Sequence, residues 1–236
     1  MTFNLRVVKI KYNYYTEIGD IMKKERDYEL YAFRFAAFIG GAFGIYAILR
    51  YGMLSSGQTM NLLNLFMSIF GANIPEFLFR LAVALFYGFG VAIGVLIPKY
   101  TKIDVRHVSI TVTAISAIIL AFMPEQYSGE YISIPIFFAM ALQWGAFPGA
   151  KGRASACVFL TNNVRQMIIG LTNYFCTKEK SHIEYSHFYM FTILSYMAGC
   201  GVSYYLTELF GAKSIAFVVI PVIIMFFIIC KDKKEK

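Results

Sequence analysis

Two polar stretches interrupt an otherwise apolar sequence, and they contain the residue types best suited to binding a solute. The first carries Gln58, Thr59 and Asn61, and the second carries Thr161, Asn162 and Asn163. An unpaired polar group in hydrocarbon costs several kcal/mol, so such stretches must lie outside the membrane, against protein, or along a water-filled cavity. Because both stretches contain Thr-x-Asn, the sequence indicates two related sets of hydrogen-bonding groups.

If each stretch breaks a helix near the middle of a membrane, its polar side chains face those of the other, and the free N–H groups at the helix starts add partial positive charge. Arg165, one helical turn beyond Thr161, would add a cation, and Gln143 would line the same cavity. The predicted substrate-binding residues are Gln58, Thr59, Asn61, Gln143, Thr161, Asn162, Asn163 and Arg165. These side chains favour a small anion or a polar neutral solute.

A purely structural interpretation stays open beside this one. The amides and hydroxyls would then bond across helices and lock the bundle, Gln143 would pack in the core, and Arg165 would snorkel or pair with Glu76. The apolar runs contain no nucleophile–base pair, phosphate-binding loop or paired carboxylates, so we expect no enzyme. We also expect no metal and no cofactor, because the cysteines and histidines lack the spacing of ligands.

The composition is that of a membrane protein. Apolar residues make up 58% of the chain and charged residues only 15%, against about 25% charged in a soluble domain. The net charge of +8 comes from lysines and arginines that cluster in short segments between apolar runs. This is the distribution that membrane topology requires, and it argues against nucleic-acid binding.

The elements that must position the polar residues are apolar runs at 31–51, 62–70, 77–97, 108–123, 131–147, 154–175, 188–206 and 214–229. Crossing the hydrocarbon takes about 20 apolar residues, so 62–70 is predicted to be a broken or re-entrant helix. If both polar segments crossed fully, the basic loop at 99–106 would lie outside, against the positive-inside rule. We therefore predict six crossings with both termini in the cytosol.

The two halves of the sequence resemble each other. Gly-Ala-Phe occurs at 41–43 and 145–147, Thr-x-Asn at 59–61 and 161–163, and Gly-x-Gly-Val at 88–91 and 199–202, in the same order. With three crossings per half, the halves would be inverted relative to each other. The predicted fold is an all-α integral membrane protein with two inverted three-helix repeats, 31–124 and 125–230. A cytosolic or interfacial tail (1–30) and a basic cytosolic tail (231–236) flank them.

The run from Tyr46 to Gly52, followed by Gln58-Thr59-x-Asn61, resembles the signature of the YoaK-like membrane proteins of bacteria, an uncharacterised family. In the second half Gln143-Trp144 and 161–163 are similar to that family's motifs. Met60 stands where the family has glycine, Trp144 stands where it has asparagine, and a residue at or near Gly44 stands where it has aspartate. The resemblance implies an architecture and a location in the bacterial inner membrane.

From these observations we expect a transporter or channel-like protein for a small polar or anionic solute, with membrane lipid around it. This interpretation predicts that Thr59→Val or Asn163→Leu abolishes transport and leaves folding intact. The alternative is a scaffold or assembly protein that does not transport and forms a homo-oligomer through its glycine-rich helix faces. Those faces contain Gly40 and Gly44, Gly90 and Gly94, and Gly145 and Gly149.

Overall fold

The structure is a computed structural model that describes residues 2–124 and 130–234, most of them in helices. The α-helices are α1 (Thr2–Tyr51), α2 (Thr59–Phe70), α3 (Ile74–Tyr100), α4 (Val105–Phe122), α5 (Ile134–Ala146), α6 (Thr161–Thr177), α7 (Lys180–Phe210) and α8 (Val219–Lys234). Two 3-10 helices, η1 (Glu130–Ser133) and η2 (Gly211–Val218), precede α5 and α8. The strands β1 (Gly149–Ala150) and β2 (Arg153–Ala154) form a hairpin.

Four stretches are long and apolar enough to cross a membrane: Asp27–Tyr51, Ile74–Tyr100, Val105–Phe122 and Lys180–Asp232. The last of them runs through α7, η2 and α8, and its 53 residues exceed the length of one crossing. α2 has only 12 residues, so it is a short helix, as predicted for the run at 62–70.

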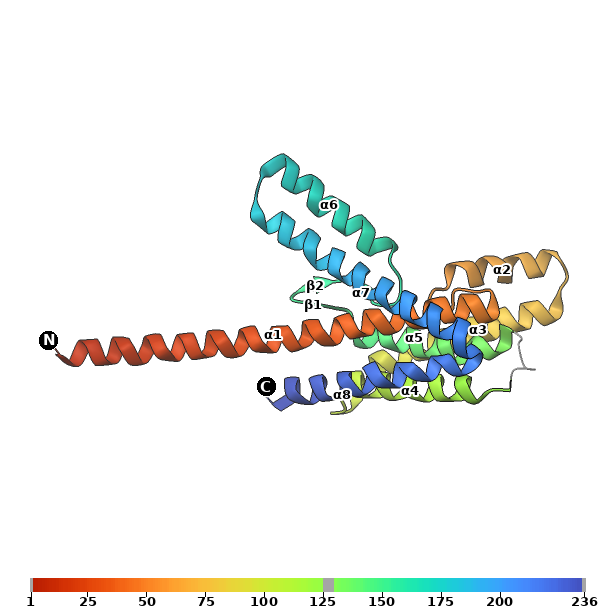
Figure 1. Cartoon of the computed structure of the whole chain (residues 1–236), viewed down its shortest axis with the longest axis horizontal. Helices are drawn as coiled ribbons and strands as arrows, with labels where there is room; N and C mark the ends of the chain where they lie inside the picture. Colours follow the sequence, from red (N-terminus) through yellow and green to blue (C-terminus); the bar gives the residue numbers. More distant parts are fainter. Residues whose placement is uncertain (1, 125–129, 235–236) are drawn as a thin grey trace.

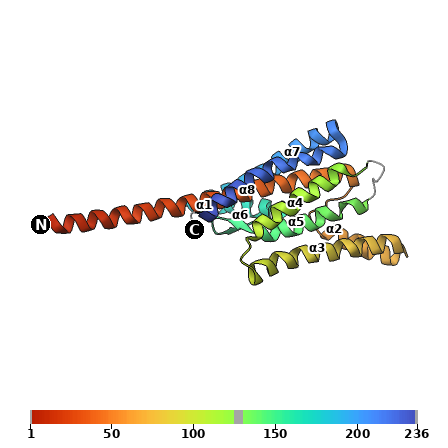
Figure 2. The same cartoon turned by 90° about the horizontal axis from the view of Figure 1, so that it is seen from below.

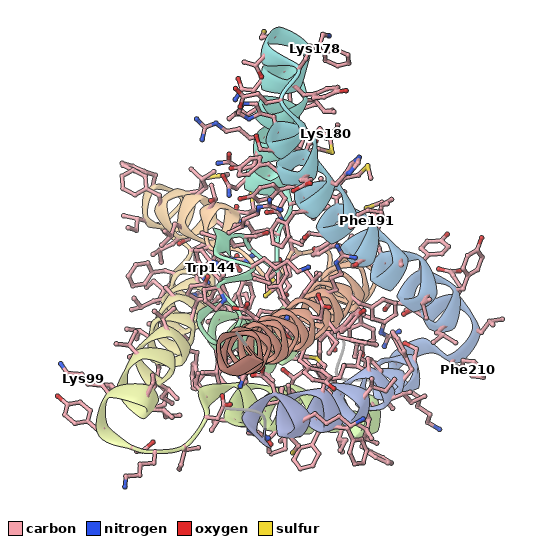
Figure 3. The ribbon with its side chains drawn as sticks, turned by 90° about the vertical axis from the view of Figure 1, so that its left-hand side faces the viewer. Lys99, Trp144, Lys178, Lys180, Phe191 and Phe210 are labelled. Atoms are coloured by element: carbon pink, nitrogen blue, oxygen red, sulfur yellow. The ribbon has the colours of Figure 1, made fainter. Side chains whose placement is uncertain are left out.

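The long helices lie roughly along one axis, and α1 begins and α8 ends at the same end of the molecule (Figures 1 and 2). α1 packs mainly on α7, α3 packs on α5, and α4 lies against α5, η2 and α8. Seen along this axis, α1 is central, and α3 and α7 lie on its two sides (Figure 3). Accordingly, 67% of the apolar window of α1 is buried, against 17% of that of α3.

Glycines let the main helix pairs approach closely. A Cβ atom at Gly41 would strike the main-chain oxygen of Tyr196, and one at Gly199 would strike that of Phe38. Across the other pair, a Cβ at Gly90 would lie 2.8 Å from the main-chain oxygen of Phe138. Small residues at such crossings bring helix backbones into contact.

The glycine faces that were predicted to contact another subunit are therefore occupied within the chain. Gly90 faces α5, a Cβ atom at Gly94 would lie 4.0 Å from the Cα of Gly145, and Gly40 packs against Cys157. Gly40, Gly90 and Gly94 therefore offer no free surface to a second subunit, whereas Gly145 is exposed, and a homo-oligomer stays a prediction.

The run at 154–175 was predicted to be apolar and interrupted by polar residues in its middle, but only its second part is helical. The chain turns back in the hairpin, where Lys151 (φ 54) and Gly152 (φ 71) take the left-handed conformation that tight hairpin turns require. It then runs without regular secondary structure until α6 begins at Thr161. The Lys151 N–H donates to the Glu29 carboxylate at 3.1 Å, which ties the hairpin to α1.

The buried Arg80 and the half-buried Arg106 form ion pairs near the starts of α3 and α4, at opposite ends of the bundle. Arg80 pairs with Glu76, as expected from their i,i+4 spacing, and also with Glu130, both at 2.6 Å. Arg106 pairs with Asp104 and Asp232 at 2.7 Å. Burial opposes ionisation of Asp104, but hydrogen bonds from the Arg106 side chain and main chain, with the charges of Arg106 and His107, lower its pKa.

Candidate functional site

The first polar segment leaves α1 at Tyr51 and leads to the start of α2 (Figure 1). Ser55 is fully buried, at 0% exposure, and its hydroxyl has no hydrogen-bond partner among the described residues. The neighbouring Ser56 is buried beside the hydroxyl of Tyr196 from α7. A buried hydroxyl without a partner is costly, so Ser55 marks a place where a polar ligand or water would gain a hydrogen bond.

Asn61 fixes the first turn of α2 against α3. Its Nδ2 donates to the main-chain oxygen of Arg80 at 3.1 Å and to Oε1 of Gln58 at 2.9 Å. Its own side-chain oxygen and the Nε2 of Gln58 are buried without a partner among the described residues. The first segment therefore combines a fixed position with unused hydrogen-bonding capacity.

In the second polar segment the buried amide has hydrogen-bond partners for both its oxygen and its nitrogen. Asn163 is fully buried, accepts a hydrogen bond from the Ser155 hydroxyl at 2.8 Å, and donates to the main-chain oxygen of Ala156 at 2.7 Å. Gln143, which is also buried, donates to the main-chain oxygen of Ala36 in α1 at 3.0 Å. These bonds anchor the extended chain before α6 to its own helix, and α5 to α1.

Both short helices begin near the middle of the molecule and run outward in different directions (Figure 1). The residues before them, Gln58 and Leu160, make no side-chain cap, and the first intrahelical N–H groups to be bonded are those of Leu62 and Val164. The N–H groups of residues 59–61 and 161–163 thus have no acceptor among the described residues. Two helix ends with partial positive charge therefore lie near the middle of the molecule.

The predicted site residues fall into three groups by their exposure. Asn61, Gln143 and Asn163 are buried, Gln58 and Asn162 are half-buried, and Thr59, Thr161 and Arg165 are exposed. Among the described residues, no hydrogen bond joins the predicted residues of the first polar segment to those of the second. Asn162 instead accepts from Gln166 of its own helix at 3.4 Å.

The side chains of Thr59, Thr161 and Arg165 are exposed and do not face one another as expected, and helix geometry explains why; their role in binding a solute stays a prediction. Residues two apart lie about 200° apart around a helix, so the threonine of Thr-x-Asn points outward when the asparagine points inward. Arg165 is four residues beyond Thr161 and shares its exposed face. Arg165 also does not pair with Glu76, whose carboxylate binds Arg80.

Sequence reasoning missed other polar side chains around these segments. Ser55 and Ser56 lie in the first polar stretch but were not chosen, and Ser155 was not singled out, although it bonds to Asn163. The serine pair between apolar residues was a usable signal. The contact of Tyr196 with this region joins residues about 140 positions apart, which no local pattern indicates.

Helices of this length and apolarity, with polar segments buried among them, are those of a helical integral membrane protein. The DUF1275 family, described as a protein of unknown function, matches residues 33–228, and the chain belongs to this family. The predicted resemblance to YoaK-like proteins is thereby confirmed, since the two names denote the same family. Neither the curated proteins nor the solved structures contain a match to this chain.

Proposed function

We propose that the protein is a membrane transporter or channel-like protein for a small polar or anionic solute. Its six crossings would form two inverted halves, and the solute would pass between the starts of α2 and α6. Inverted repeats with interrupted helices that meet near the midplane are the architecture of many transporters. The pattern of contacts between the helices supports this proposal most directly.

The main pairs of helices in contact stay the same when each helix of one half is replaced by its counterpart in the other half. If α1, α2, α3 and α4 are matched to α5, α6, α7 and α8 with η2, the α1–α7 contact becomes α5–α3. The α2–α3 contact becomes α6–α7, and the α4–α5 contact becomes α8–α1, and all of these pairs are in contact. Such exchange is expected of two halves related by a two-fold axis.

Details of the crossings support the same relation. Gly199 of α7 faces the main-chain oxygen of Phe38 in α1, and Gly90 of α3 faces that of Phe138 in α5. The short helices also correspond, because each follows a segment without regular secondary structure, lacks a side-chain cap, and buries the asparagine of its Thr-x-Asn. A duplicated unit accounts for all these features together.

The side chains at the interior helix starts are amides and hydroxyls, with Ser55, Gln58 and Asn61 around the first and Asn163 at the second. Uncapped N–H groups at both helix starts favour negative charge or a hydrogen-bond acceptor. This combination supports a compact anion or a neutral polar solute.

The six-crossing arrangement predicts the side on which each loop reacts with a membrane-impermeant maleimide. In a Cys176→Ser background, which removes the exposed native cysteine, Lys213→Cys should be labelled on intact cells. Lys102→Cys and Lys178→Cys should be labelled only after permeabilisation, because basic loops stay in the cytosol. Labelling of both Lys102→Cys and Lys213→Cys on intact cells would instead indicate eight crossings.

The transport proposal predicts that Ser55→Ala separates activity from stability. Removing a buried hydroxyl that has no partner should leave the free energy of unfolding unchanged or slightly raised. In proteoliposomes, the flux of formate, nitrate, chloride or glycerol, followed by light scattering after an osmotic step, should fall at least about tenfold, since one lost hydrogen bond in a pathway costs about 1.4 kcal/mol or more.

The matched control for this experiment is Ser195→Ala. Ser195 bonds only to the main-chain oxygen of Phe191 in its own helix, so its removal should not change the flux. Wild-type rates equal to those of protein-free vesicles for every one of these solutes would refute a passage for small solutes. Equal fluxes for wild type and Ser55→Ala would remove Ser55 from the pathway.

A further inference from the structure

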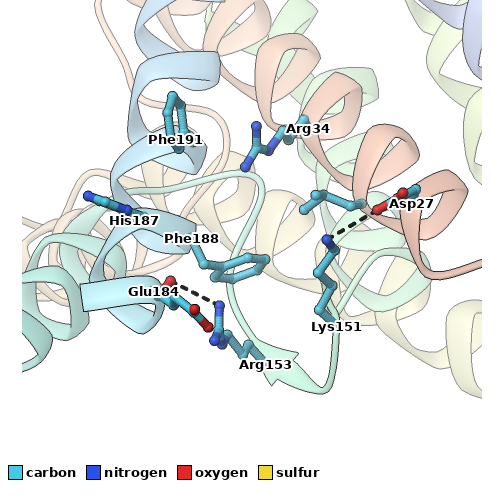
Figure 4. Close-up of a pocket in the computed structure, with 9 residues that line it drawn as sticks. Asp27, Arg34, Lys151, Arg153, Glu184, His187, Phe188 and Phe191 are labelled. Atoms are coloured by element: carbon cyan, nitrogen blue, oxygen red, sulfur yellow. Dashed lines mark hydrogen bonds and ion pairs between the residues drawn. The ribbon is translucent and has the colours of Figure 1, made fainter. Parts of the chain in front are cut away.

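A charged pocket lies at the end of the bundle where α1, the β-hairpin and α7 meet, away from the polar segments. Its volume is about 630 Å³. The lining residues are Asp27, Leu30, Arg34, Lys151, Arg153, Glu184, His187, Phe188 and Phe191. In Figure 4 the side chain of Arg34 from α1 and those of Lys151 and Arg153 from the hairpin surround the hollow, and Phe188 of α7 lies between them.

The two arginines of this pocket have no carboxylate partner among the described residues. The Nε of Arg34 is buried without any hydrogen-bond acceptor, and its guanidinium stacks on Phe191 at 4.9 Å. Arg153 donates to the main-chain oxygen of Glu184 at 3.1 Å and stacks on Phe188 at 5.5 Å. Leaving a buried guanidinium donor unpaired costs free energy, and an anion in the pocket would recover it.

The third cation of the pocket is already engaged. Lys151 Nζ lies 3.1 Å from the carboxylate of Asp27, and both side chains are about 40% exposed, so the pair is a weak, solvent-screened one. A stronger anion could share or take Lys151 from Asp27. Counting Arg34, Lys151 and Arg153 against Asp27 and Glu184, the pocket carries a net positive charge with His187 neutral.

We propose that this pocket binds a phosphate group, either of a small soluble molecule or of a phospholipid headgroup. Guanidinium groups match the oxygens of phosphate with two parallel hydrogen bonds, and an ammonium adds a point charge. One cation on α1 and two on the facing hairpin suit an anion that offers oxygens in several directions. The apolar floor of Phe188 and Leu30 excludes water from one side and strengthens these interactions. This site is separate from the proposed passage and holds whether or not the protein transports a solute.

The first test measures thermal unfolding of the full-length protein in a non-ionic detergent, with and without inorganic phosphate at constant ionic strength. Saturating phosphate should raise Tm by about 5 °C, as expected for a ligand that binds the folded state well above its Kd. Arg34→Gln should abolish this shift and keep the Tm measured without phosphate, because Arg34 has no ion pair to lose. Lys213→Gln, at an exposed lysine outside the pocket, is the control and should keep the full shift.

A second variant is expected to bind phosphate more tightly, and misfolding cannot produce such an increase in affinity. Asp27→Asn removes the carboxylate that competes for Lys151, so half-saturation should occur at a phosphate concentration several-fold lower. If Arg34→Gln fails to fold, the change in half-saturation of Asp27→Asn alone decides whether the pocket binds phosphate. An unchanged half-saturation in Asp27→Asn, or a full phosphate shift in Arg34→Gln, would overturn the proposal.

The source of the phosphate group is settled by replacing inorganic phosphate with phosphatidic acid in the same assay, and with phosphatidylcholine as a zwitterionic comparison. An Arg34-dependent shift with micromolar phosphatidic acid, and none with millimolar phosphate, would assign the pocket to a lipid headgroup. The reverse would assign it to a soluble phosphate. If neither compound stabilises the wild-type protein, the pocket does not bind phosphate.

Discussion

Gly199→Ala should destabilise the protein by about 1–3 kcal/mol, the usual cost of overpacking a tight contact. The added methyl group would strike the main-chain oxygen of Phe38 in α1. A backbone atom cannot rotate away as a side chain can, so α1 and α7, the most extensively packed helix pair, would have to move apart. The measurement is the free energy of unfolding, obtained by denaturant titration in mixed micelles and followed by circular dichroism.

Gly201→Ala provides the control on the same helix. Gly201 is exposed and nothing lies within 4 Å of the position of its Cβ. Alanine is favoured over glycine in a helix by about 1 kcal/mol, so this variant should be as stable as the wild type or more so. Equal losses in both variants would show that the α1–α7 contact is not the reason for the glycine at 199.

Asn163→Leu should lower the free energy of unfolding by about 2–4 kcal/mol, since a single change leaves two buried polar groups unpaired. These groups are the Ser155 hydroxyl and the main-chain oxygen of Ala156, both of which bond to the Asn163 amide. The sequence had suggested that this variant would fold normally and only lose transport. The burial and bonding of the amide in the structure replace that expectation.

Asn173→Leu is the matched control, because Asn173 is exposed near the other end of α6. Its stability should stay within about 0.5 kcal/mol of the wild type, as is usual for surface substitutions. If Asn163→Leu is also that stable, the amide does not hold the second segment. Asn163 would then be free to serve a solute, as the sequence first indicated.

The polar segments show how far the sequence could predict this architecture. From the short apolar run at 62–70 the sequence indicated a short helix, and α2 covers Thr59–Phe70. It also indicated a polar interruption in the run at 154–175, and α6 begins at Thr161. What it could not supply was the residue at which each helix begins, and this decides which side chains face inward. A helix start at Thr161 turns Thr161 and Arg165 outward and Asn163 inward, so one position of uncertainty changes the predicted site.

The hairpin and the charged pocket illustrate two different limits. The hairpin had a local signal, since Lys151-Gly152 follows Pro148-Gly149, a combination typical of turns. The pocket had none, because Arg34, Lys151 and His187 come from elements far apart in the chain and meet only through tertiary packing. The cationic residues were visible in the sequence, but it did not show which of them lie close together or which lack an ion-pair partner.

The hairpin and the residues just after it connect the charged pocket to the start of α6. Arg153 lines the pocket, and Ser155, two residues later, holds the buried amide at the start of α6. An anion bound to Arg153 would therefore restrain the chain that leads to the start of α6. Linkage is reciprocal, so any rearrangement that loosened this chain would in turn release the anion.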